Sequence, residues 1–395
     1  MTTEPSANVT KRRIIVCIIL AVLVSSSLSA LLFADSPNGA VATPVQSLRV
    51  VVDPRAELLS IIFRLAGNPE YNILCVKPYD DEVEKYFGKF RDHPAVKLAQ
   101  KVGQTRKVSY NAPMSLAIHL TDTNNLQLRV PLEPWPEGLD RRWTASDVGD
   151  FMEAARQFVE DTSFQRFIEQ HGPFYQTVAG RMQAMLDKEA HLEWFDTFFG
   201  LRPNARFAVV IGMLNGNGNY GVRFRAAGND DELFCILRPW GADSQGLPEF
   251  RNTVPTVVHE FCHSYCNAII ERHLAELQPS GDALFEPVSK QMRSRAYSNA
   301  QTLLKESLVR ACVIRYRRQY EGEEAARRVA QSEKKNGFFC MPELVDLLAD
   351  YEAHREQYPT LEDFLPRLIR FFAEAAERIS STQGDMTNAG SPSSQ

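Results

Sequence analysis

The sequence predicts an α+β protein that is rich in helix and has a small antiparallel sheet in the middle of the chain. Three short apolar or alternating runs, at 207–213, 220–224 and 233–237, are separated by turns rich in glycine and asparagine. Helical patterns lie before and after these runs, with apolar residues recurring every three or four positions. At 395 residues, of which 44% are hydrophobic, the chain is long enough to bury a large core.

The region before the predicted sheet begins with a strand at 48–52 and continues as helices. Asp53 can cap a helix that opens with Pro54, because an aspartate side chain accepts hydrogen bonds from the free amides of a first helical turn. A connector rich in proline and tryptophan follows later, after which Ser146 starts helical patterns that run to about Phe199. We therefore expect helices along the N-terminal side of the sheet.

The region after the predicted sheet is expected to be helical from Pro248 onward. The segment 360–363 has the pattern of a capping box, in which a threonine and an acidic residue bond each other's backbone amides. From about Ser381, serine, glycine, asparagine and proline dominate, a composition typical of disorder. We therefore expect one folded domain over 43–380 and a disordered tail over 381–395.

The first 42 residues have the features of an export signal. Three basic residues at 11–13 precede an uncharged run at 14–34, and the small residues at 40–42 suit a signal peptidase. The run is also long enough to span a bilayer, so an uncleaved membrane anchor over 1–42 is the alternative. In both cases we expect an exported protein that is periplasmic, secreted or anchored to the outer face of the cytoplasmic membrane.

Charge and cysteine content limit the expected partners and cross-links. The 44 Lys+Arg and 49 Asp+Glu leave a formal charge of -5, so the broad basic surface of a nucleic-acid-binding protein is not expected. Peptides, proteins or small molecules are the expected partners. Six cysteines lie after the export segment, where disulfides are permitted, but their spacing fits buried small residues equally well.

The main chemical signal is the HExxH pattern formed by His259, Glu260 and His263. Pro255 can occupy the first turn of a helix that runs to about Arg272, and the i, i+4 spacing then places both histidines on one face. Both imidazoles can bind one zinc ion, with Glu260 beside them to take a proton from an attacking water. Two surface histidines on an ordinary helix would not explain the apolar residues around the motif. The pattern therefore predicts a zinc site with Glu260 as its general base.

Zinc needs a third protein ligand, and the short-range histidine of the pattern HExxHxxGxxH is missing because Ile269 stands in its place. A predicted helix capped by Ser298 and Gln301 carries Glu306 among apolar neighbours. We predict Glu306 as the third ligand, with Arg310 one turn later holding its carboxylate. An exposed ion pair between these two residues is the alternative. The competing ligands are Glu271, Glu276, Glu286 and His273.

Several blocks of the chain resemble one bacterial protein family, grouped as domain of unknown function 4932 and placed among the gluzincin metallopeptidases. The blocks are 52–60, 86–87 with 92–98, 219–221, 259–264 and 306–311. The resemblance implies a helix-rich, zincin-like metallopeptidase fold with an HExxH active-site helix. It also implies His259, His263 and Glu306 as zinc ligands and Glu260 as general base, but it implies no substrate.

In zincins an antiparallel edge strand beside the metal binds the substrate backbone, and 214–222 is the candidate segment because its glycines permit close approach. A simple hairpin turn explains the same segment equally well. The expected substrate contacts are Asn217, Asn219, Tyr220 and Gly221. Tyr297, which precedes the Glu306 helix, can reach the site as a hydrogen-bond donor to a developing oxyanion, although packing against the helix start is the alternative.

The predicted function is that of an exported, Zn²⁺-dependent metallopeptidase of the gluzincin type, acting on a peptide or protein substrate. One alternative is a non-catalytic, zinc-containing protein that binds a peptide or a cell-wall component. Glu260 argues against it, because a binding protein needs no base beside the two histidines. The other alternative is a metal-dependent amidase acting on a non-peptide substrate.

Overall fold

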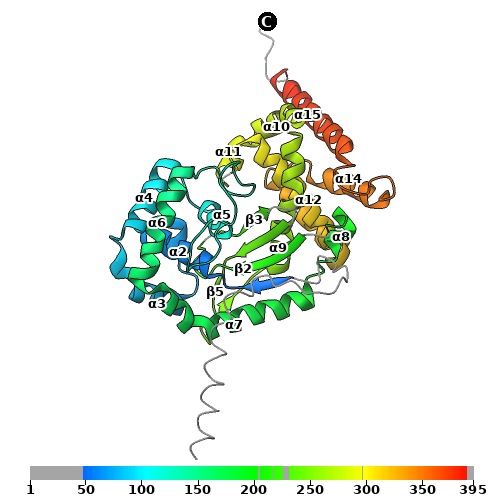
Figure 1. Cartoon of the computed structure of the whole chain (residues 1–395). Coiled ribbons are helices and arrows are strands. Elements are labelled where there is room, and N and C mark those ends of the chain that lie inside the picture. The colour runs from blue at the N-terminus through cyan, green and yellow to red at the C-terminus, as the bar shows by residue number, and fades with distance from the viewer. Residues whose placement is uncertain (1–47, 203–204, 217, 226–230, 296, 389–395) are drawn as a thin grey trace, which may run out of the picture. The chain divides into compact units, whose positions relative to one another are not determined.

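The chain is an α+β protein rich in helix, as the sequence predicts (Figure 1). The computed structural model describes residues 48–388, except 203–204, 217, 226–230 and 296, with side chains described up to 379. The predicted export segment 1–42, including the run at 14–34, lies outside the described residues. Among the described helices, none is long and apolar enough to cross a membrane.

Four strands form the central sheet, in the order β1-β2-β4-β3. Their bounds are Arg49–Val51 for β1, Ala205–Ile211 for β2, Tyr220–Arg225 for β3 and Asp231–Leu237 for β4. Both β1 and β4 run parallel to β2, and β3 alone is antiparallel to its neighbour β4. The prediction of an antiparallel sheet is therefore wrong, because the sheet is mixed and β2 and β3 do not pair as a hairpin.

The pairing of β4 explains why the turn residues between the apolar runs led to the prediction of an antiparallel sheet. Turn residues show where the chain changes direction, but they do not show which strand it pairs with. Every residue of β4 is buried, and it lies between β2 on one side and β3 on the other. A continuous apolar run of this kind is typical of an interior strand with parallel pairing. A second, two-stranded antiparallel sheet joins β5, Gly241–Ala242, to β6, Pro248–Glu249.

Helices follow β1 along the N-terminal part of the domain. Their bounds are Pro54–Leu65 for α2, Pro69–Asn72 for the 3₁₀ helix η2, Lys77–Phe87 for α3, Gly88–Phe90 for the 3₁₀ helix η3, Pro94–Arg106 for α4, Asn111–His119 for α5 and Ala145–Thr162 for α6. The predicted cap is confirmed, because the Asp53 carboxylate accepts a hydrogen bond of 2.9 Å from the amide of Arg55. Helix α6 begins one residue before the predicted Ser146, because Thr144 caps it by accepting a bond from the amide of Asp147.

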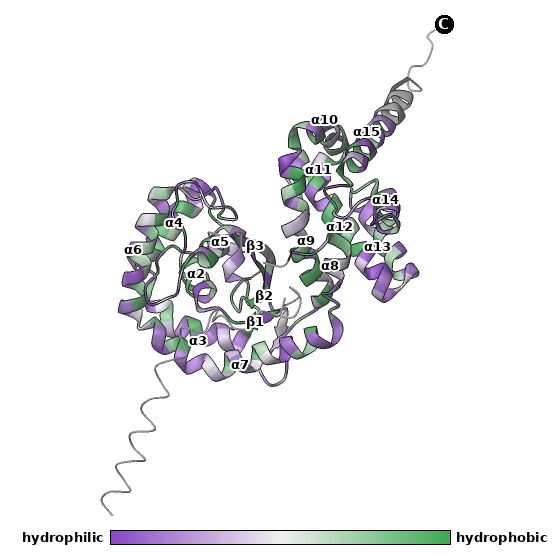
Figure 2. Cartoon of the chain, turned by 45° about the vertical axis from the view of Figure 1, so that its right-hand side comes forward, coloured by the Kyte–Doolittle hydropathy of each residue, from purple (hydrophilic) through white to green (hydrophobic). Residues whose placement is uncertain are grey.

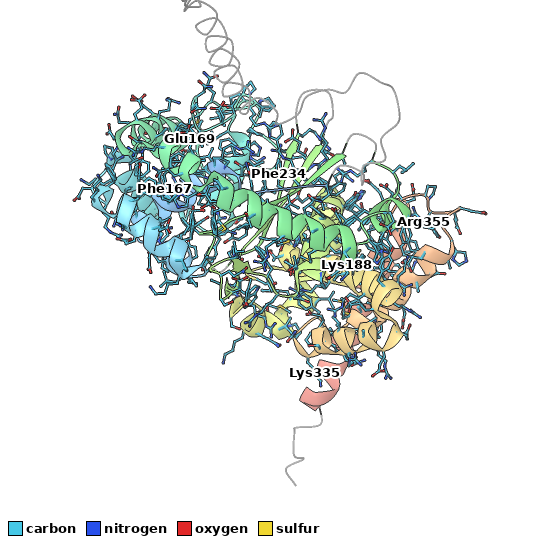
Figure 3. All side chains as sticks on the ribbon, turned by 90° about the horizontal axis from the view of Figure 1, so that it is seen from below. Phe167, Glu169, Lys188, Phe234, Lys335 and Arg355 are labelled. Carbon is cyan, nitrogen blue, oxygen red and sulfur yellow. The ribbon has the colours of Figure 1, made fainter. Side chains whose placement is uncertain are left out.

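A long helix lies beside the outer strand β1. It is α7, Phe164–Glu189, and the short helix α8, Trp194–Phe199, follows it. Figure 3 shows α7 running from Phe167 to Lys188. The side chain of Gln183 accepts a hydrogen bond of 3.1 Å from the amide of Val50, which attaches α7 to the edge of the sheet.

The C-terminal part of the domain is helical, as predicted, but it begins at Thr253 and not at Pro248, which lies in β6. The bounds are Thr253–Arg272 for α9, Leu274–Phe285 for α10, Glu286–Val288 for the 3₁₀ helix η4, Ser289–Arg293 for α11, Ala300–Glu321 for α12, Glu323–Lys335 for α13, Met341–Ala353 for α14 and Leu365–Asn388 for α15. Thr360 and Asp363 form the predicted reciprocal cap before α15. Because α15 continues to Asn388, the domain boundary expected at 380 does not coincide with a helix end, and 389–395 lie outside the described residues.

The hydrophobic core surrounds the sheet and continues between the helices. Phe261 of α9 packs against Phe195 and Phe207, with ring centroids 6.1 and 4.9 Å apart. These contacts bury one face of α9 against β2 and α8. The outer helices are amphipathic, and Figure 2 shows hydrophilic and hydrophobic residues alternating along α6. The sheet therefore supports α9 from one side and leaves its other side for polar residues.

Candidate metal centre

Helix α9 determines where the HExxH residues lie. Pro255 is in the first turn of the helix, as predicted, which suits a residue without an amide hydrogen. Val257 and Val258 are fully buried against the core, whereas His259 and His263 are only partly buried. The two histidines are one helical turn apart and therefore share one face.

The side chains of His259, His263 and Glu306 converge. The Nε2 atoms of His259 and His263 are 3.1 Å apart. The Glu306 carboxylate oxygens lie 3.8 Å from Nε2 of His259 and 3.4 Å from Nε2 of His263. Two ligand atoms of a tetrahedral zinc ion are about 3.3 Å apart, from zinc–ligand bonds of about 2.0–2.1 Å. Among the described residues, this is the group of His, Cys, Asp and Glu whose ligand atoms can hold one metal ion.

Glu306 reaches the site from α12. The cap of this helix is Asn299, not the predicted Ser298, because Asn299 accepts a hydrogen bond of 2.8 Å from the amide of Thr302. Both residue types are good caps, so the sequence could not decide between neighbours. Of the competing ligands, Glu271 instead pairs with Lys305 at 2.5 Å.

The Glu306 carboxylate is buried and only partly satisfied. Nη2 of Arg310 lies 3.1 Å from Glu306 Oε2, as predicted for a residue that holds the carboxylate. This ion pair is the contact of the buried Oε2, which has no further hydrogen-bond partner among the described residues. Burial acts to raise the pKa of Glu306, but the neighbouring His263, His259 and Arg310 lower it below its ordinary value. Glu306 is therefore a buried anion whose carboxylate can accept a further partner besides Arg310.

Further side chains contact the candidate ligands. Arg310 donates hydrogen bonds to the hydroxyl of Tyr297 at 2.8 Å and to Glu333 at 3.0 Å. On α9, Oδ1 of Asn267 lies 3.2 Å from Nδ1 of His263, which directs Nε2 of that ring toward the other two ligands. Asn267 and Glu333 are not among the site residues that the sequence predicts. The i, i+4 spacing from His263 to Asn267 was an available signal, but the long-range partner Glu333 had none.

The protonation states suit metal binding. Burial, followed by the neighbouring His263, lowers the pKa of His259 to about 3, so this imidazole is neutral at pH 7 and offers a lone pair. The pKa of Glu260 is raised to about 7, because burial and the neighbouring Glu306 raise it by more than His263 and a hydrogen bond from Gly221 lower it. A bound dication would lower the pKa of Glu260 again, because it stabilises the carboxylate.

The predicted substrate segment lies partly beside the site. Gly221 is in the edge strand β3, and a Cβ atom there would lie 2.7 Å from the carbonyl oxygen of Glu260, so this close approach needs glycine. Asn219 uses its side-chain oxygen to accept a hydrogen bond of 3.0 Å from the amide of Arg238. Tyr220 begins β3, and Asn217 lies outside the described residues.

The six described cysteines are free. Cys266 of α9 and Cys312 of α12 are the pair whose sulfur atoms approach each other, at 3.9 Å, and both are fully buried. Cys266 therefore packs between the two helices and is not part of the group that can hold a metal. This placement agrees with the expectation of small buried residues.

Fold and site together define an α+β protein in which two helices that pack together, α9 and α12, carry a three-residue candidate metal centre. The family whose sequence model matches residues 48–371 is described as Domain of unknown function (DUF4932). The match covers well over half of the chain, so the chain belongs to this family. Comparisons with curated proteins and with solved structures gave no match.

Proposed function

We propose that this protein is a zinc-dependent hydrolase that cleaves peptide bonds. In this proposal His259, His263 and Glu306 hold the zinc ion, and Glu260 is the general base. The observation that carries the proposal is the convergence of two imidazole nitrogens and one carboxylate next to a cavity of about 270 Å³, which His259 and Glu260 both line. A binding protein would have no need for the buried carboxylate of Glu260 beside these ligands.

The donor set fits zinc. Catalytic zinc sites use three protein ligands of these types and keep a fourth position for water or substrate. A cation would also give Glu306 Oε2, a buried oxygen whose contact is the ion pair with Arg310, a second partner. The contact from Asn267 to His263 is the kind of outer contact that orients metal-binding histidines.

When bound, zinc would polarise the substrate carbonyl and make water a stronger nucleophile. Glu260 would accept a proton from the attacking water while the water oxygen bonds to the carbonyl carbon. The C–N bond then breaks, and Glu260 returns the proton to the leaving nitrogen. The amide of Gly221, which contacts Glu260, would hold its carboxylate in place during both transfers.

Tyr297 fits a positioning role better than the predicted role as an oxyanion donor. Its hydroxyl is engaged with Arg310 at 2.8 Å, and Arg310 in turn contacts Glu306. Tyr297 is not among the residues that line the cavity beside His259. We propose that Tyr297 orients Arg310 and so keeps Glu306 directed at the metal.

We further propose that the protein has a zincin-like fold of the gluzincin type and that it is exported. The support for the fold is the antiparallel edge strand β3, which lies against the HExxH helix as zincin edge strands do. The support for export is the basic and apolar pattern of 1–42 in the sequence.

The test compares the unmodified protein with Glu260→Gln at equal zinc content. The amide keeps the size of the side chain but cannot accept a proton, so hydrolysis of a peptide library should fall by about 10²–10⁴ while zinc stays bound. Metal analysis of both samples is the control. If the zinc-loaded variant cleaves at the unmodified rate, Glu260 is not the base. If the unmodified protein binds peptides but cleaves none, the binding-protein alternative holds.

A further inference from the structure

The candidate metal centre lies between two cavities. The first, of about 270 Å³, is lined by His259 and by Thr256 in the N-terminal half of α9, and we refer to it as the His259 cavity. The second, of about 160 Å³, is lined by His263 and by Ala268 in the C-terminal half of α9, and we refer to it as the His263 cavity. Free space is therefore present on both sides of the proposed ligands.

The edge strand β3 passes both cavities. Asn219, just before the strand, lines the His259 cavity, whereas Gly221 and Arg223 line the His263 cavity. Thr256 and Ala268 are twelve residues apart on one helix, which corresponds to about 18 Å at 1.5 Å per residue. An extended polypeptide rises about 3.3 Å per residue, so about five residues fit along this length.

We propose that the protein cleaves internal bonds of an extended polypeptide segment, which occupies both cavities at once, and does not remove residues from a chain end. This inference rests on the proposed function. The reaction is the hydrolysis described above, and its two products are a new C-terminal carboxylate and a new N-terminal amine.

The charges in the two cavities support internal cleavage. An enzyme that acts at a chain end needs an unpaired cation for the terminal carboxylate, or an unpaired anion for the terminal amine. Apart from Glu260 and the two histidines, each charged residue that lines either cavity already has an ionic partner among the described residues. The pairs are Arg310 with Glu306 and Glu333, Arg317 with Glu321, Arg223 with Glu137 and Asp231, and Glu271 with Lys305. The cleft therefore favours the neutral backbone of an internal segment.

A third cavity lengthens the cleft on the His259 side. It has a volume of about 470 Å³ and shares Asn252, Pro255 and Arg317 with the His259 cavity. Because the same three residues line both cavities, the two cavities adjoin, and open space continues beyond the His259 cavity on that side of the candidate metal centre.

The first experiment uses two peptide libraries and the unmodified, zinc-loaded protein. Both contain the same dodecapeptides, but one has free termini and the other is acetylated and amidated. We expect both libraries to be cleaved at internal positions, with rates that agree within about threefold, because neither terminus is recognised. A loss of more than a hundredfold on blocking either end would overturn the inference and leave the proposed function standing. No cleavage in either library would overturn both.

A binding measurement tests the same point without turnover. On the Glu260→Gln background, Thr256→Trp fills the His259 cavity and Ala268→Trp fills the His263 cavity. We expect each variant to reduce retention of the blocked library at least tenfold, as measured by mass spectrometry of bound peptides. Glu153→Trp, on an exposed position of α6, is the matched control and should not reduce it. Unchanged retention with either cavity filled would show that the substrate occupies one side only, which contradicts the inference.

Discussion

The helix α2 and the α9–α12 pair both bury carboxylates, but they differ in how the protein satisfies them. Around α2, Asp53 is held by Arg55, and Asp80 is held by Arg64 and by two backbone amides. Glu57 accepts hydrogen bonds from a tyrosine hydroxyl at 2.8 Å and from a backbone amide at 2.9 Å. Each oxygen of these three carboxylates therefore has a partner within the chain.

At the candidate metal centre the partners are incomplete. Oε2 of the buried Glu306 has its ion pair with Arg310 but no further hydrogen bond among the described residues, and the Nε2 atoms of His259 and His263 face each other. Burying a polar atom without a partner destabilises a protein, so such an arrangement persists when something else supplies the partner. The comparison suggests that buried carboxylates with complete partners serve the fold, and that converging donors with incomplete partners indicate a ligand site.

The largest effect expected from this comparison comes from breaking an ion pair near α2. Asp80→Ala, in α3, leaves Arg64 of α2 buried and unpaired, which should lower the free energy of unfolding by about 3–5 kcal/mol. Glu84→Ala, also in α3, is the matched control, because the ion pair of Glu84 with Arg91 is about half exposed. Loss of this exposed pair should lower the free energy of unfolding by less than about 1 kcal/mol. Denaturant unfolding measures both variants. Equal losses would remove the distinction between structural and exposed pairs.

A smaller effect is expected at the outer contact of the metal centre. Asn267→Ala removes the partner of His263 Nδ1, so zinc affinity should fall about tenfold or more while the fold is kept. Asn267→Asp can still accept the same hydrogen bond and should retain most of the affinity. Competition with a zinc chelator gives both values. If the alanine variant binds zinc as tightly as the unmodified protein, Asn267 does not orient His263.

The smallest effect per step of the measurement is a slope, the change of stability with each pH unit that Glu57 causes. Burial raises its pKa to about 8, although hydrogen bonds from Tyr79 and Met213 oppose the shift. Because the folded pKa exceeds the unfolded value, the contribution to stability is complete below about pH 4.5 and declines as pH rises toward about 8, by at most about 1.4 kcal/mol per unit. Glu57→Gln cannot titrate, so its unfolding free energy relative to the unmodified protein should rise across this range. A difference that does not change with pH would contradict the assignment of a protonated Glu57.

Some parts of the site could be predicted because their signals are local. The i, i+4 spacing of His259 and His263 places them on one face of any α-helix, and both residues lie in α9. The apolar neighbours of Glu306 predicted a buried position on a helix, and Glu306 is a buried residue of α12. The cap at Asp53 also depends only on adjacent residues.

Other parts depend on contacts between distant segments and could not be read from the sequence. The parallel pairing of β2 with β4 joins strands that are separated by β3, so turn residues could not reveal it. The partner Glu333 comes from α13, and its contact with Arg310 exists only once α12 and α13 pack together. The two cavities likewise combine residues from β3, α9 and α12.

The side chains that converge at α9 and α12 should bind one zinc ion. The zinc content of the purified protein after dialysis shows whether they do, measured by mass spectrometry for the unmodified chain, Glu306→Ala and Glu271→Ala. We predict one zinc per chain in the unmodified protein and in Glu271→Ala, whose side chain pairs with Lys305, and a loss of zinc in Glu306→Ala. Zinc content in Glu306→Ala equal to that of the unmodified chain would contradict the claim.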